Sequence, residues 1–207
     1  MSLNKDLLKT LKTSDLKDVT KDITESGIDL LIKNEILKEI PIIKSIVGVF
    51  KLGISIKDMF FLKKLLRFLN EINDTTLEER ANIINKIEQN PQYTHNLGEN
   101  LILLIDKLDD LDKANIIGKL FKSVLEQRID IITFQRICHA VNGIFIHDIY
   151  ELHKLWKGEN IVHDIKNNLF IYGFMKRKSF GQVALDGSNE FEINSLGKIL
   201  IEELYNH

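Results

Sequence analysis

The sequence predicts a mostly α-helical protein: a helical bundle followed by a small C-terminal winged-helix-like module that combines helices and strands. Apolar residues recur three and four positions apart along most of the chain, as they do on one face of a helix. Two prolines and eleven glycines in 207 residues leave little of the turn chemistry of an all-β protein. An apolar share of 44% over this length is sufficient for a self-sustaining core.

The chain divides into three predicted parts: an N-terminal helical arm at 1–25, a helical bundle at 26–156 and the winged-helix-like module at 157–207. Leucines at helical spacing in residues 3–24 favour one or two short amphipathic helices in the arm. Ser26 and Gly27 interrupt that pattern, and a further helical pattern follows from Gly27 to Glu39.

The next predicted helix runs from about Pro41 to Ile56, because proline suits the first turn of a helix, where its missing N–H group is not needed. Its polar residues fall on one narrow stripe, so most of its circumference is apolar. The helix after it, about Lys57 to Ile72, has the usual amphipathic pattern, with lysines and arginine opposite an apolar face.

Five more helices complete the predicted bundle. Thr76 and Glu79 have the spacing of a capping box and start a helix that runs through Ile87. The other predicted starts are Thr94 or Gly98 for the next helix, Asp112 for the third, Asp130 or Thr133 for the fourth and Ile144 for the last.

In the last fifty residues the sequence pattern changes from helices alone to a mixture of helices and strands. A helix from Glu159 to Tyr172 ends at Gly173, a common helix stop. The Asp186-Gly187 pair between 183–185 and 191–193 predicts a β-hairpin. A final helix from Ser195 to Leu204 closes a pattern similar to a winged helix.

The sequence contains no signature of catalysis, and we expect no enzyme activity, no cofactor and no metal site. The cluster of Asp106, Asp109, Asp110 and Asp112 could hold a hard cation. Asp106 and Asp110 lie away from the apolar stripe of the predicted helix, which favours a solvated face and a helix cap instead of a metal site.

The expected location is the cytoplasm, with recruitment to the inner face of the membrane left open. A single cysteine fits a reducing compartment. The N-terminal residues lack the apolar region of a secretory signal. No stretch of about eighteen residues is free of charge, as a plain transmembrane helix requires.

The net charge of −2 is the sum of a positively charged segment and a negatively charged remainder. Residues 41–70 contain six cations and one anion, a local charge of +5, which leaves −7 for the rest. A cationic segment with a wide apolar arc can bind a membrane interface. The candidate membrane-interaction residues are Ile42, Lys44, Ile46, Val47, Gly48, Phe50, Lys51, Gly53, Ile54, Phe60 and Phe61.

A second function class is DNA binding through the winged-helix-like module. The candidate nucleic-acid residues are Lys166, Lys176, Arg177 and Lys178. Neutralising phosphates supplies most nucleic-acid affinity, and acidic residues surround these cations, so nucleic acid is the less favoured partner. A plain adaptor that oligomerises through its bundle is the third possibility.

Several runs resemble a family of small uncharacterised bacterial and prophage helical proteins: residues 40–48, 51–56, 61–69, 104–110 and 192–197. The resemblance extends in the same order over roughly residues 27–205. It implies no catalytic residues, and it implies a role in defence against phage. The leading hypothesis is therefore a non-enzymatic antiviral sensor and effector. In it, the hairpin Pro41–Asn70 acts on membrane lipid after a phage protein triggers its release.

Overall fold

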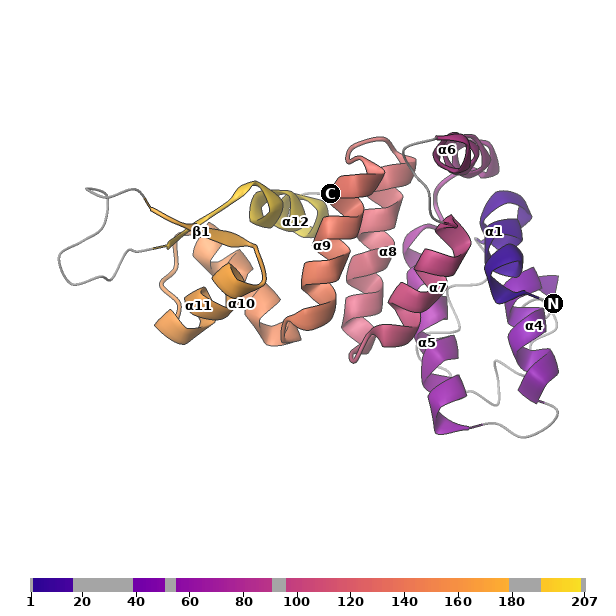
Figure 1. Cartoon of the computed structure of the whole chain (residues 1–207), viewed down its shortest axis with the longest axis horizontal. Coiled ribbons are helices and arrows are strands. Elements are labelled where there is room, and N and C mark those ends of the chain that lie inside the picture. The colour runs from indigo at the N-terminus through magenta and orange to yellow at the C-terminus, as the bar shows by residue number, and fades with distance from the viewer. Residues whose placement is uncertain (1, 17–38, 51–54, 91–95, 179–190, 206–207) are drawn as a thin grey trace. The chain divides into compact units, whose positions relative to one another are not determined.

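The computed structural model describes residues 2–16, 39–50, 55–90, 96–178 and 191–205; for Val49 and Phe50 it describes the backbone alone. These residues form ten helices and one two-stranded antiparallel sheet (Figure 1). The predicted mostly helical class is confirmed.

The chain folds as two compact units, Met1–Ile131 and Ile132–His207, called here the N-terminal and C-terminal units. The helix at 146–156 packs against two helices that follow it in the C-terminal unit.

The N-terminal unit is entirely helical in its described parts. Its core is the packing of α5 against α8. There, the rings of Phe68 and Phe121 lie 5.5 Å apart, and Gly118 lets α8 approach the backbone of α5. The helices are α1 (Leu3–Thr13), α4 (Pro41–Phe50), α5 (Ile56–Glu71), α6 (Leu77–Gln89), α7 (Leu97–Lys107) and α8 (Leu111–Leu125).

Local capping chemistry fixes several helix starts. Pro41 is the first residue of α4, as predicted. The predicted capping box at Thr76 is confirmed, and Ser55 forms a second one with Asp58 at the start of α5. The expected cap of α8 was wrong: the side chain of Asp110, not Asp112, accepts the hydrogen bond, and its donor is the N–H of Asp112.

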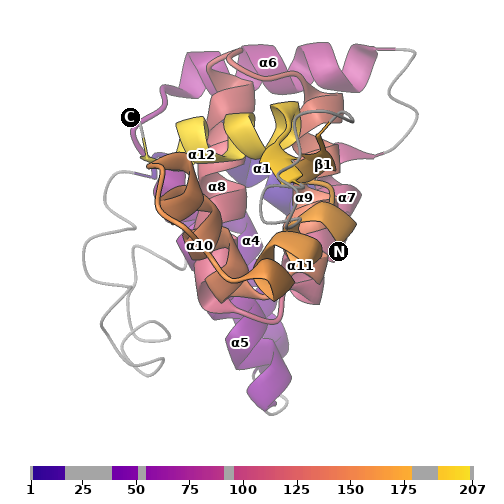
Figure 2. The same ribbon diagram turned by 90° about the vertical axis from the view of Figure 1, so that its left-hand side faces the viewer.

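The C-terminal unit combines helices with a small two-stranded sheet (Figure 2). Leu169, Phe174 and Leu200 are fully buried in it. A Cβ at Gly197 would lie 2.4 Å from the carbonyl oxygen of Phe174, so glycine is needed for this close packing. The elements are α9 (Ile131–Gly143), α10 (Ile146–Trp156), α11 (His163–Ile171), β1 (Met175–Arg177), β2 (Phe191–Ile193) and α12 (Ser195–Tyr205).

In the described part of the chain, Phe191–Ile193 pairs with β1, in a register that places Lys176 opposite Glu192. The predicted hairpin partner of Phe191–Ile193, residues 183–185, lies outside the described residues and stays a prediction. The helix expected from Glu159 starts later, at His163, and it ends before Gly173, whose φ of +86° suits glycine.

Candidate functional site

The predicted membrane-interaction residues do not form one exposed surface. On α4, Ile42 and Ile46 are buried, Val47 is half-buried, and only Lys44 and Gly48 are exposed. On α5, Phe60 is exposed and Phe61 is half-buried. The remaining candidates, the Phe50 side chain, Lys51, Gly53 and Ile54, lie outside what the structure describes.

Helix α1 covers the apolar face of α4. Thr10 is fully buried, and its Oγ1 accepts a hydrogen bond of 3.1 Å from the backbone N–H of Ile42. Near the other end of the contact, the Ser45 hydroxyl donates to Asp6 Oδ2 at 2.7 Å. In this arrangement Ile42 and Ile46 are shielded from any lipid surface.

Within the described part of the chain, every helix is too short or too polar to cross a membrane.

Several cations of the positively charged segment are engaged inside the N-terminal unit. Arg67 Nη1 lies 2.6 Å from Asp112 Oδ1. Lys64 is buried, and its Nζ donates to the carbonyl oxygens of Asp106 at 2.6 Å and Leu108 at 2.8 Å, at the C-terminal end of α7. Burial lowers the pKa of Lys64. Its charge therefore stabilises a helix end rather than facing outward.

A pocket of about 570 Å³ lies beside these residues. Arg67 and Asp112 are paired in its wall, and Asp109 accepts from the buried Lys113, outside the lining, at 2.6 Å. In the part of the chain that the structure describes, no group of three or more His, Cys, Asp or Glu side chains is placed to hold a metal ion. The pocket is lined by Phe60, Lys64, Arg67, Leu108, Asp109, Asp110, Leu111 and Asp112.

The predicted nucleic-acid residues lie in the C-terminal unit, but three of them have partners within it. Lys176 Nζ lies 3.0 Å from Glu192 Oε1 across the sheet. The guanidinium of Arg177 sits over the rings of Phe170 at 5.6 Å and Phe191 at 6.0 Å. Lys166 Nζ donates to Asn160 Oδ1 at 3.1 Å. Lys178 is half-buried at the end of the described strand region.

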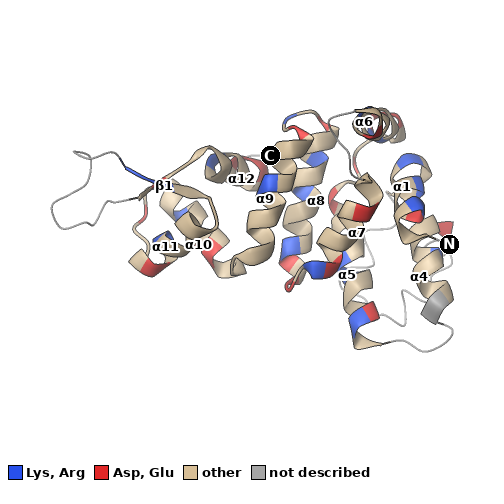
Figure 3. Ribbon diagram, in the orientation of Figure 1, with Lys and Arg blue, Asp and Glu red and all other residues tan. Residues whose placement is uncertain are grey.

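Sequence reasoning missed an apolar surface at the C-terminal end of α11, called here the α11 patch: Phe145, Phe170, Ile171 and Tyr172. Ile171 is 71% exposed and Phe145 is 67% exposed. The ring of Tyr172 lies against Gly143, where a Cβ would be 2.6 Å from it, so α11 ends beside the turn that carries Phe145. Most of α11 carries no charge (Figure 3). The signal in the sequence was three consecutive large apolar residues, 170–172, before a glycine stop.

The patch and the positive segment differ in what they can bind. Exposed aromatic and branched side chains bury area against another apolar surface, and they give no hydrogen bonds to phosphates. Comparison with known proteins adds no relative: no protein-family model, curated protein or solved structure matches this chain.

Proposed function

We propose that this chain is a non-enzymatic interaction protein whose C-terminal unit binds another protein through the α11 patch. One observation carries the proposal: α11 exposes apolar side chains at its C-terminal end, while the neighbouring cations Lys176 and Arg177 are engaged within the unit. Clustered exposed apolar residues are a common mark of protein-binding surfaces on soluble domains.

The order of elements supports a winged-helix-like description of this unit. Three helices, a strand, a second strand paired with it and a last helix follow one another, and α11 takes the place of a recognition helix. A recognition helix that reads DNA needs cations toward phosphates. Helix α11 supplies Lys166 and also carries Asp164, which favours a protein over DNA as the partner.

The partner we propose has an apolar recess that takes up the exposed side chains of the α11 patch. The resemblance to bacterial and prophage proteins makes a phage protein the first partner to test. Binding of this kind would give the sensor role expected from the sequence.

The test uses the full chain with a photo-crosslinking amino acid at position 171, in bacteria with and without phage infection. We expect one protein to be crosslinked at position 171 and not at the exposed Lys86. The identified protein is then purified and titrated against the full chain by calorimetry. Ile171→Ser should weaken binding at least tenfold, because it removes the most exposed apolar side chain of the patch.

The matched control is Leu103→Ser, an exposed apolar residue in the N-terminal unit, which should leave the affinity unchanged. Equal affinities for wild type and Ile171→Ser would contradict the proposal. A crosslink between two copies of the chain would favour the oligomeric adaptor instead. Salt-dependent binding to duplex DNA that is lost on neutralising Lys176, Arg177 and Lys178 would favour the DNA-binding alternative.

A second candidate, the triggered membrane effector, is favoured by one observation: among the described helices, the extensive interface of α4 is with one short helix, α1. Released α4 would offer Ile42 and Ile46 to anionic lipid beside Lys44. Vesicles of phosphatidylglycerol loaded with a fluorescent dye should stay intact with the full chain alone and leak when a purified trigger is added. Absence of leakage with a trigger that binds would exclude this candidate.

A further inference from the structure

In the N-terminal unit, α1 and α4 form a helix pair, and the contacts of this pair with the other described helices are made mainly by α1. Of the described helices, α1 is the one with which α4 shares an extensive interface, whereas α1 itself also packs against α6 and α7. Leu7 and Leu11 on α1 are fully buried in these contacts. The position of α4 therefore depends on the docking of α1.

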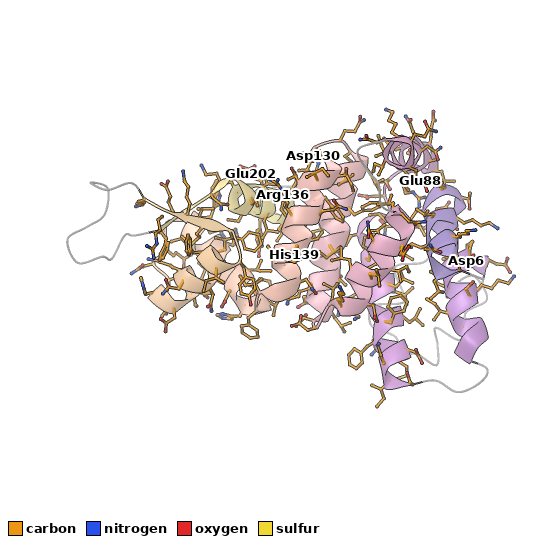
Figure 4. All side chains as sticks on the ribbon, viewed as in Figure 1. Asp6, Glu88, Asp130, Arg136, His139 and Glu202 are labelled. Atoms are coloured by element: carbon orange, nitrogen blue, oxygen red, sulfur yellow. The ribbon has the colours of Figure 1, made fainter. Side chains whose placement is uncertain are left out.

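Docking of α1 relies on one close backbone approach. Gly98 at the start of α7 faces Asn4, and a Cβ at that position would lie 2.4 Å from the Asn4 carbonyl oxygen. Polar contacts add to the docking near both ends of α1: Asp6 accepts from Ser45, and Lys12 pairs with Glu88 on α6. Asp6 and Glu88 are labelled in Figure 4.

Arg80 on α6 is a charged residue that is buried in this interface. Its side chain is 1% exposed, and its Nη2 donates to the Ser14 carbonyl oxygen at 2.9 Å, just after α1 ends. Among the residues that the structure describes, its buried Nε and Nη1 atoms have no hydrogen-bond partner. Burial lowers the pKa of this guanidinium, and Asp15 offsets part of that effect.

A buried charged group with unsatisfied donors destabilises the state that buries it. The state that buries Arg80 is the one in which the end of α1 is docked on α6. When this end of α1 lifts, water reaches the guanidinium and satisfies its free N–H groups. The docked and lifted states are thus closer in free energy than the apolar contacts of α1 alone would make them.

We infer that α1 is a releasable strap: it detaches from α6 and α7 while the α5–α8 core stays folded, it uncovers the apolar face of α4, and the buried Arg80 makes this opening easier. Local openings below the global unfolding free energy are general in proteins, and segments with few partners open first. This inference concerns the N-terminal unit and does not depend on the α11 patch or on what α4 contacts after release.

Hydrogen–deuterium exchange of the full chain, read by mass spectrometry in peptides of α1, α4, α5 and α8, tests the strap. In wild type we expect the amides of α1 and α4 to exchange together and at least tenfold faster than those of α5 and α8. Arg80→Met should slow exchange in α1 and α4 about tenfold, because it keeps the apolar stem and removes the buried charge. Lys86→Met, an exposed site on the same helix, should leave the rates unchanged.

Gly98→Ala should act in the opposite direction. It should speed exchange in α1 and α4 and leave α5 and α8 protected, since the added Cβ meets backbone that has to move away. Exchange of α1 and α4 at the same rate as α5 and α8 in wild type would overturn the strap. Exchange in Arg80→Met that is as fast as in wild type, or faster, would overturn the role of Arg80.

Discussion

The buried hydroxyl of Thr10 on α1 caps the first turn of α4 by accepting a hydrogen bond from the N–H of Ile42. The first N–H groups of a helix have no partner inside it, and a side chain just before the helix usually supplies one. Ile40, which precedes α4, has no oxygen in its side chain, and Pro41 has no N–H. A residue thirty-two positions earlier takes over this function, and this couples the start of one helix to the docking of another.

Thr10→Val should therefore destabilise the protein by about 1–2 kcal/mol, because it keeps the shape of the side chain and leaves the Ile42 N–H buried without an acceptor. Urea denaturation followed by circular dichroism measures the loss. Thr13→Val is the matched control, since the exposed Thr13 hydroxyl donates to Lys9 within the same helix, and it should change the stability by less than about 0.5 kcal/mol. Equal losses for both variants would show that the cap contributes nothing specific.

Replacing two helical glycines by alanine should change the stability of the protein in opposite directions. A Cβ at Gly118 on α8 would lie 2.7 Å from the Cβ of Glu71 and 2.9 Å from the Phe68 carbonyl oxygen. Gly118→Ala should therefore cost about 1–3 kcal/mol, because α5 and α8 have to separate. Among the described residues, no atom outside the backbone of α4 and the residues next to Gly48 lies within 4 Å of a Cβ at Gly48, so Gly48→Ala should stabilise by up to about 1 kcal/mol through helix propensity. Thermal denaturation of both variants gives the two signs, and a stabilising Gly118→Ala would contradict the close packing.

Glu71 should make the protein less stable as the pH rises. Burial raises the pKa of its carboxyl group, the nearby Asp74 adds to the rise, and Lys119 and Lys122 oppose it. A carboxyl whose pKa is higher in the folded than in the unfolded protein favours folding while it is protonated. That contribution is present below the unfolded pKa of about 4.3 and is lost as the pH rises through the folded pKa.

Glu71→Gln removes this titration. Its stability relative to wild type should increase between pH 4 and pH 7, measured by urea denaturation at each pH. A Gln variant that loses stability relative to wild type as the pH rises would show that the lysines outweigh the burial of Glu71.

The local features of this chain could be predicted from its sequence, and the features that join distant segments could not. Thr76 and Glu79 form their capping box within four residues, so their spacing was sufficient. The pairing of β2 with β1 could not be predicted from the Asp186-Gly187 signal, because that signal favours a neighbouring strand and β1 lies further back in the chain. In the candidate sites, α1 packs against α4, where Ile42 and Ile46 are buried, and the helical pattern of these two residues was equally consistent with exposure to lipid.

Asn194 joins three elements of the C-terminal unit and provides the most discriminating set of substitutions. Its Oδ1 accepts from the N–H of Gly197 at 3.0 Å and caps α12. Its Nδ2 donates to the carbonyl oxygens of Gly173 at 2.8 Å and Met175 at 3.3 Å, which fixes the end of α11 next to the start of β1. Asn194→Ala should cost about 2 kcal/mol, because it removes a helix cap and leaves two part-buried carbonyls without their donor.

Asn194→Ser and Asn194→Asp separate these two roles. Serine keeps a cap for α12 and loses the reach to both carbonyls, so it should cost about 1 kcal/mol. Aspartate also keeps the cap, but its ionised carboxylate has no donor and faces two carbonyl oxygens, so it should be less stable than the serine variant at pH 7. At pH values low enough to protonate it, the carboxyl regains one donor, and its stability relative to the serine variant should rise. Urea denaturation of the variants between pH 3.5 and pH 7 measures both effects. An aspartate variant that is more stable than serine at pH 7 would mean that the cap of α12, and not the bridge to Gly173 and Met175, is what Asn194 contributes.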